Sequence, residues 1–169
     1  MNLPNTITLT RTILIVPFIV LLYASFPYHE WVSAGFFLIL ALMDGLDGYL
    51  ARKNNQVTDF GKFLDPLSDK LLVISPLILF IGKGAVAWMV LLIIIREISV
   101  TGLRILAMNK NIVIDAAPIG KLKTVSQMIA VVAVILGLAH ASWFLLIATL
   151  FTLISGIDYF LAGRRILKE

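Results

Sequence analysis

Long runs of apolar residues, separated by short polar segments, occupy almost the whole chain. A helix that crosses a bilayer needs about 20 predominantly apolar residues. Runs near this length can be placed at roughly 12–26, 31–51, 63–82, 85–107, 119–140 and 142–163. The pattern therefore predicts an all-α, polytopic membrane protein with six transmembrane helices.

The polar segments between these runs are short and rich in residues that end helices, such as "PYHE" and "GKG". The opening "MNLPNTITLTR" differs from a secretory signal peptide, because its basic residue follows the polar stretch. We expect it to form a short N-terminal interfacial helix before the first span. We also expect residues 1–169 to form a single membrane domain.

Composition and charge agree with a membrane location. Hydrophobic residues make up 60% of the chain and charged residues 14%, so a water-soluble fold is excluded. Most basic residues lie on one side of the predicted topology, with Lys83 alone on the other, and the basic side is expected to be cytoplasmic. We therefore expect a multi-pass protein of the cytoplasmic membrane with both termini inside, and no nucleic-acid partner for its net charge of +4.

Two stripes of small, acidic and basic residues flank the loop after the second predicted span. The first stripe lies within about 140° of arc on a helix, and it consists of Asp44, Asp47, Gly48, Ala51 and Arg52. The second stripe is spaced by four residues, and it consists of Gly61, Asp65 and Asp69. The short loop allows the two stripes to face each other on the cytoplasmic side.

Carboxylates gathered at membrane depth repel one another unless cations neutralise them. Two divalent ions would balance the four aspartates. The chain contains no cysteine, so oxygen ligands favour Mg²⁺, Mn²⁺ or Ca²⁺ over Zn²⁺. Paired divalent ions are typical of phosphoryl transfer. The simpler alternative is that the aspartates only pair with Arg52, Lys62 and Lys70.

The order of these residues resembles the signature of the CDP-alcohol phosphatidyltransferase family at every fixed position. In this chain the signature reads Asp44-x-x-Asp47-Gly48-x-x-Ala51-Arg52, eight residues, then Gly61-x-x-x-Asp65-x-x-x-Asp69. The resemblance implies a helical membrane enzyme, usually a homodimer, that transfers a phosphatidyl or similar group from a CDP-linked donor to an alcohol and releases CMP.

The resemblance also implies a role for each matching residue. Asp44, Asp47, Asp65 and Asp69 would bind the metal ions, and Asp69 would in addition be the catalytic base. Asp44 and Asp47 would hold the CDP-linked donor together with Gly48, Ala51, Arg52 and Gly61.

A second polar cluster is expected to select the acceptor alcohol. Arg96, Thr101 and Arg104 lie in the cytoplasmic half of the fourth predicted span, and Lys121 and Lys123 begin the next. Arginine and lysine at this depth are suited to a phosphorylated acceptor. For Arg104, Lys121 and Lys123, anchoring at the cytoplasmic surface is an open alternative.

These segments, with the opening "NLPNTITLTR", are similar to the branch of the family that makes phosphatidylglycerophosphate. That likeness implies CDP-diacylglycerol and sn-glycerol 3-phosphate as substrates, and it places Asn5, Thr8 and Arg11 at the border of the headgroup site. Other acceptors, as in cardiolipin, phosphatidylserine or phosphatidylinositol-phosphate synthesis, remain an alternative. Intramembrane prenyl transfer and a small ion transporter are further alternatives.

Overall fold

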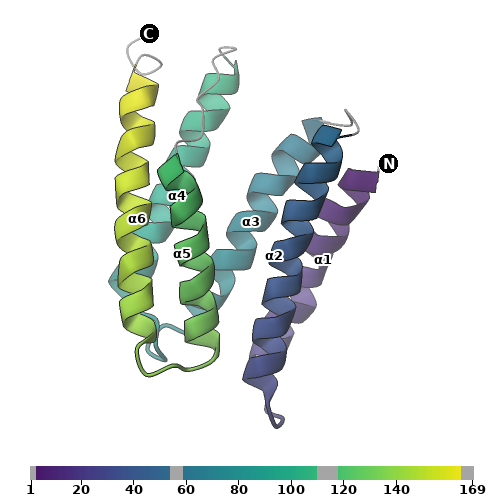
Figure 1. Cartoon of the computed structure of the whole chain (residues 1–169), viewed down its shortest axis with the longest axis vertical. Coiled ribbons are helices and arrows are strands. Elements are labelled where there is room, and N and C mark those ends of the chain that lie inside the picture. Colours follow the sequence, from purple (N-terminus) through teal and green to yellow (C-terminus); the bar gives the residue numbers. More distant parts are fainter. Residues whose placement is uncertain (1–2, 54–58, 110–117, 165–169) are drawn as a thin grey trace. The chain divides into compact units, whose positions relative to one another are not determined.

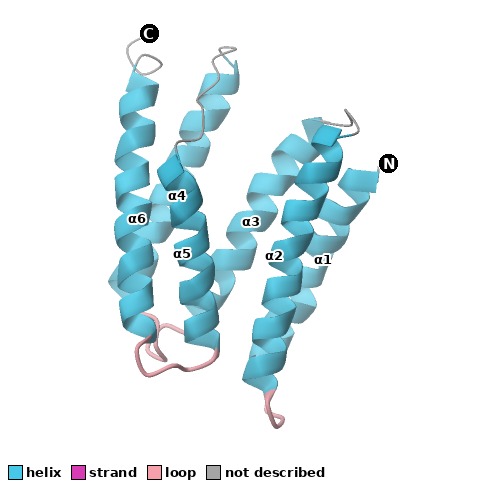
Figure 2. Cartoon of the chain, viewed as in Figure 1, coloured by secondary structure: helices cyan, strands magenta, loops and turns pink. Residues whose placement is uncertain are grey.

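The computed structural model describes residues 3–53, 59–109 and 118–164. Within these ranges the chain forms six α-helices and no β-sheet, which confirms the all-α prediction (Figures 1 and 2). The helices are α1 (Leu3–Leu22), α2 (His29–Lys53), α3 (Asp59–Leu79), α4 (Ala87–Asn109), α5 (Pro118–Ile135) and α6 (Ala141–Ala162). The chain divides into two compact units, Met1–Leu79 and Phe80–Glu169. The single domain expected for 1–169 stays a prediction.

Helix α1 packs against both α2 and α3 in the first unit. Phe18 of α1 and Phe37 of α2 are fully buried, and their ring centroids lie 6.1 Å apart. Leu40, one turn further along α2, is also fully buried. This spacing on α2 places an apolar stripe against α1.

The opening of the chain differs from expectation. The predicted interfacial helix and the predicted first span form one continuous helix, Leu3–Leu22. Pro4 is tolerated in the first turn, where the missing N–H has no helical partner to lose. The hydroxyl of Thr12 donates to the Thr8 carbonyl at 2.8 Å, so a polar side chain is satisfied without ending the helix.

Helix α6 packs against α4 and α5 in the second unit. Val131, Val134, Leu145 and Ala148 are fully buried among these helices. Helix α5 is followed by a turn that contains Gly137, whose φ of 60° is in the left-handed region. The Leu138 amide donates to the Ala133 carbonyl and the Gly137 amide to the Val134 carbonyl, which is the Schellman pattern that reverses a chain after a helix.

The outer faces of the helices are apolar, as expected in a bilayer. Three stretches of the described residues are long and apolar enough to cross a membrane: Asn5–Leu22, His29–Leu46 and Ala141–Ala162. Trp31, Trp88 and Trp143 are exposed in the first turns of α2, α4 and α6, as interfacial indoles would be. That the segments 63–82, 85–107 and 119–140 also cross the membrane stays a prediction.

Replacing Phe18 with alanine should reduce the free energy of unfolding by about 3 kcal/mol, because it leaves a cavity between α1 and α2. The measurement is equilibrium unfolding of the purified protein in mixed detergent micelles. Val20→Ala is the matched control, because Val20 lies on the same helix and is 66% exposed. Equal stability of the two variants would contradict the proposed packing of α1.

Candidate active site

Arg11 is at the centre of the polar contacts in the first unit. Its side chain is fully buried, and its Nη1 atom forms an ion pair with Oδ1 of Asp44 and donates to Oδ1 of Asp69 at 2.9 Å. These contacts join α1 to α2 and α3. A buried guanidinium requires a counter-charge, so the two carboxylates stabilise Arg11. Arg11 in turn holds the two carboxylates close together.

A hydroxyl contact lies beside this ion cluster. Thr12 directly follows Arg11, Ser68 directly precedes Asp69, and their hydroxyl oxygens are hydrogen-bonded. Ser68 is fully buried. The contact fixes α1 against α3 at the level where Arg11 meets Asp69.

Asp65 is one turn before Asp69 on α3. Its Oδ1 atom is buried and has no hydrogen-bond partner among the described residues. A buried carboxylate oxygen is costly unless a donor or a cation satisfies it. Asp65 therefore has the environment expected of a carboxylate that binds a cation.

The acidic residues fit a divalent metal ion in their chemistry. Oδ1 of Asp44 and Oδ1 of Asp69 approach one positively charged nitrogen, and Asp65 offers a further buried oxygen. Carboxylate oxygens suit Mg²⁺ and Mn²⁺. Among the described side chains, no group of three or more possible ligands is assembled. The side chain of Asp47 lies outside the described residues, so the four-aspartate site stays a prediction.

The residues expected to hold the CDP group are described only in part. Gly61 is buried and Gly48 is half-buried. The side chains of Asp47, Ala51 and Arg52 lie outside the described residues. The CDP-binding site therefore stays a prediction.

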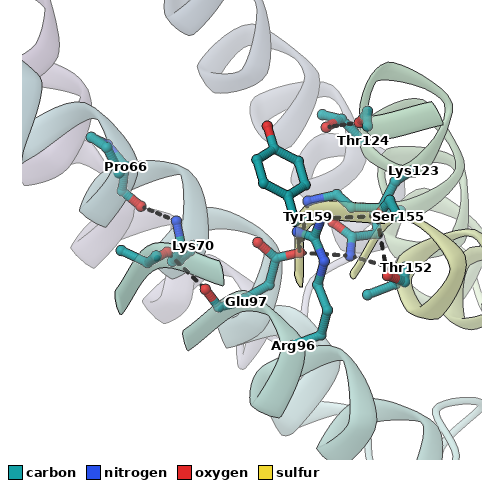
Figure 3. A network of polar contacts seen from close by, with 12 residues as sticks. Pro66, Lys70, Arg96, Glu97, Lys123, Thr124, Thr152, Ser155 and Tyr159 are labelled. Atoms are coloured by element: carbon teal, nitrogen blue, oxygen red, sulfur yellow. Dashed lines mark hydrogen bonds and ion pairs between the residues drawn. The ribbon is translucent and has the colours of Figure 1, made fainter. Parts of the chain in front are cut away.

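Glu97 organises a buried polar network in the second unit (Figure 3). Its Oε1 atom accepts hydrogen bonds from Lys123 Nζ at 2.6 Å, Arg96 Nη1 at 3.2 Å and Gln127 Nε2 at 3.3 Å. All four side chains are buried. A single carboxylate thus neutralises part of the charge of two cations and joins α4 to α5.

Arg96 extends from α4 to α6. Its Nη2 atom donates to Ser155 Oγ at 2.8 Å (Figure 3). A Cβ atom added at Gly156 would lie 3.0 Å from Arg96 Cγ. Glycine at this position therefore allows the arginine side chain to lie directly against α6.

Tyr159 of α6 contacts two arginines of α4. Its hydroxyl accepts a hydrogen bond from Arg104 Nη2. The Cζ atoms of Arg96 and Arg104 lie 5.6 Å and 5.1 Å from the centroid of its ring. Both distances are within the range of a cation–π interaction.

The structure connects some of the predicted acceptor residues and separates others. Glu97 links Arg96 to Lys123, and Tyr159 links Arg96 to Arg104. The Thr101 hydroxyl donates to the Glu97 carbonyl within α4 at 2.7 Å, so it is used by its own helix. Lys121 is exposed.

The residues predicted to border the headgroup site lie on α1. Asn5 is half-buried and Thr8 is buried. Arg11 contacts the predicted metal ligands directly, an association that the sequence did not indicate.

Four residues of the buried network around Glu97 and Arg96 were not identified from sequence: Gln127, Thr152, Ser155 and Tyr159. Gln127 Nε2 donates to Thr152 Oγ1 at 2.9 Å, which joins α5 to α6. The sequence did contain a signal for Gln127, because Lys123 and Gln127 are four residues apart in an apolar run and so share one helix face. Thr152, Ser155 and Tyr159 follow one another at spacings of three and four, which places them on one face of a helix.

Residues 1–154 match the CDP-alcohol phosphatidyltransferase family. The chain belongs to this family. The match covers the aspartate signature and most of the buried network, and it confirms the family that the signature predicted.

Three family members that are similar to this chain carry the same name. The proteins of Bacillus subtilis strain 168 and Rickettsia bellii are 42% and 36% identical to it. The alignments cover 99% and 97% of this chain, and 97% and 96% of the two relatives. Both are named CDP-diacylglycerol--glycerol-3-phosphate 3-phosphatidyltransferase, as is a protein of Wigglesworthia glossinidia brevipalpis, 42% identical over 78% of this chain and 75% of its own length.

In this phosphatidyltransferase, Glu97→Gln should reduce the free energy of unfolding by about 3 kcal/mol, because two buried cations lose their counter-charge. Thermal and chemical unfolding in detergent measure the change. A second substitution, Lys123→Gln in the same chain, should restore part of the loss by removing one of those cations.

Asp158→Asn is the control for this experiment, because Asp158 is an exposed carboxylate on α6. It should change stability by less than about 0.5 kcal/mol. If Glu97→Gln is as well tolerated as Asp158→Asn, Glu97 does not organise the network.

Proposed function

We propose that the chain transfers the phosphatidyl group of CDP-diacylglycerol to sn-glycerol 3-phosphate, giving phosphatidylglycerophosphate and CMP. The observation that carries the choice of acceptor is the cationic cluster of buried Arg96 and Lys123 with exposed Arg104, linked by Glu97 and Tyr159. Cations held at depth are suited to a phosphate monoester. The names of the similar proteins support the same acceptor.

In the proposed reaction, the hydroxyl oxygen of glycerol 3-phosphate forms a bond to the β-phosphorus of CDP-diacylglycerol. The bond between that phosphorus and the bridging oxygen of the diphosphate breaks, and CMP leaves with the electron pair. Asp69 takes the hydroxyl proton as general base. The two acyl chains remain in the lipid, so the site needs to admit only the headgroup.

Asp44, Asp47, Asp65 and Asp69 are the proposed ligands of two divalent cations, Mg²⁺ or Mn²⁺. Such ions, when bound, would stabilise the negative charge that develops on the diphosphate. Gly48, Ala51, Arg52 and Gly61 are proposed to hold the CDP group. Arg11 supplies the positive charge that Asp44 and Asp69 share in the described structure.

The acceptor phosphate is assigned to Arg96, Arg104 and Lys123, with Thr101 and Lys121 as further candidates. Asn5 and Thr8 are proposed to border the headgroup site with Arg11. We also propose a homodimer in the cytoplasmic membrane, with the reaction on the cytoplasmic side.

The purified protein should release CMP when supplied with CDP-diacylglycerol, glycerol 3-phosphate and Mg²⁺ or Mn²⁺. Asp69→Asn should lower this rate at least about a hundredfold, because it removes the general base. Glu30→Gln is the control, since Glu30 is exposed near the start of α2 and contacts His29. Chelation of the metal should stop CMP release, and added Mg²⁺ or Mn²⁺ should restore it.

Two results, one from an acceptor competition and one from a flux measurement, would overturn the proposal. If serine, inositol phosphate or phosphatidylglycerol outcompetes glycerol 3-phosphate, the acceptor is wrong. Ion flux in liposomes without CMP release would instead favour a transporter.

The proposed orientation can be tested with single cysteines, because the chain contains none. In intact cells, an impermeant maleimide should label Lys83→Cys, because Lys83 is on the side with few basic residues. The same reagent should label Arg164→Cys only after the membrane is permeabilised. The reverse pattern would invert the topology, and the parent chain controls for background.

A further inference from the structure

We propose that Tyr159 is a positioning residue that orients Arg96 and Arg104 toward one phosphate group of the acceptor. This inference rests on the proposed function and deepens it. Tyr159 lies outside residues 1–154, which match the family, and no sequence motif identified it.

The two arginines do not meet through the geometry of α4 alone. They are eight residues apart, so their backbones are separated by about 12 Å along the helix and about 80° around it. Tyr159 brings both side chains to one place, because each guanidinium carbon lies within 6 Å of its ring centroid. The ring is 4% exposed, and packing therefore restricts its own position.

Tyr159 orients the arginines without neutralising them. A carboxylate in the same place would cancel one positive charge, as Glu97 does in its contacts with Arg96 and Lys123. An aromatic ring and a neutral hydroxyl attract and align guanidinium groups but leave their charge unchanged. The charge of Arg104, and the part of the Arg96 charge that Glu97 does not neutralise, therefore remain for a phosphate monoester, which carries nearly two negative charges at neutral pH.

Arg96 also has a buried donor that is available to a ligand. Its Nε atom is buried and has no hydrogen-bond partner among the described residues, whereas its Nη1 and Nη2 atoms bond to Glu97 and Ser155 (Figure 3). An unsatisfied buried donor on a charged group is costly. A phosphate oxygen would satisfy it. Arg104 is exposed, so its guanidinium is accessible to the same group.

The test combines equilibrium binding with kinetics on the full chain in detergent. Calorimetry with glycerol 3-phosphate, and with glycerol as the phosphate-free control, measures binding without turnover. Tyr159→Phe removes the hydroxyl and keeps the ring, whereas Tyr159→Leu removes both. Phe160→Leu is the matched control, because the neighbouring Phe160 is 42% exposed.

Tyr159→Phe should weaken binding of glycerol 3-phosphate about tenfold, the loss of one hydrogen bond to a charged group. Tyr159→Leu should weaken it further, and Phe160→Leu should bind like the parent. In the transfer reaction, the KM for glycerol 3-phosphate should rise by a similar factor. The KM for CDP-diacylglycerol and kcat should stay within about twofold of the parent.

Unchanged binding in both Tyr159 variants would overturn the inference and leave the proposed function intact. An equal loss of kcat and of affinity for both substrates, with a lower Tm, would show a structural role and also overturn it. Failure of the parent protein to bind glycerol 3-phosphate would also overturn the inference. A different result would separate the two proposals. If the parent protein binds glycerol 3-phosphate and Tyr159→Phe weakens that binding, but no CMP is released, the positioning role stands and the proposed reaction fails.

Discussion

Charge that is removed from water must be balanced inside the chain, and this constraint determines the polar interior of both units. Arg11 is fully buried and is neutralised by Asp44 and Asp69. Glu97 is buried with Arg96 and Lys123. Each cluster joins helices that are distant in the sequence. Because removing one member leaves an uncompensated charge, the same residues that would bind substrates also hold the helices together.

Sequence alone predicted much of the fold, because helices in a bilayer must satisfy their own backbone groups and therefore appear as long apolar runs. The described helices correspond to the runs that the sequence shows. The ends were less predictable. Leu3–Leu22 is one helix where an interfacial segment and a span were expected, since threonine side chains that look polar in the sequence can bond to the backbone of their own helix.

The candidate site was predictable where its residues share one helix. The spacing of Asp65 and Asp69 places both on one face of α3, and the family signature identified them. Contacts between helices were not predictable, because a single sequence does not state which residue of one helix faces which residue of another. Arg11 was expected near the headgroup, whereas it contacts Asp44 and Asp69. Tyr159 contacts Arg96 and Arg104, and the sequence gave no signal for it beyond its spacing from Ser155.

The turn at Gly137 has a consequence for how the chain can vary in length. It ends α5 sharply, and α6 begins at Ala141. The distance along the chain from Gln127 to Thr152 thereby sets which residues of the two helices meet. One residue inserted into either helix between these positions would rotate the later residues of that helix by about 100°. Insertions and deletions between Gln127 and Thr152 should therefore be rare among related sequences.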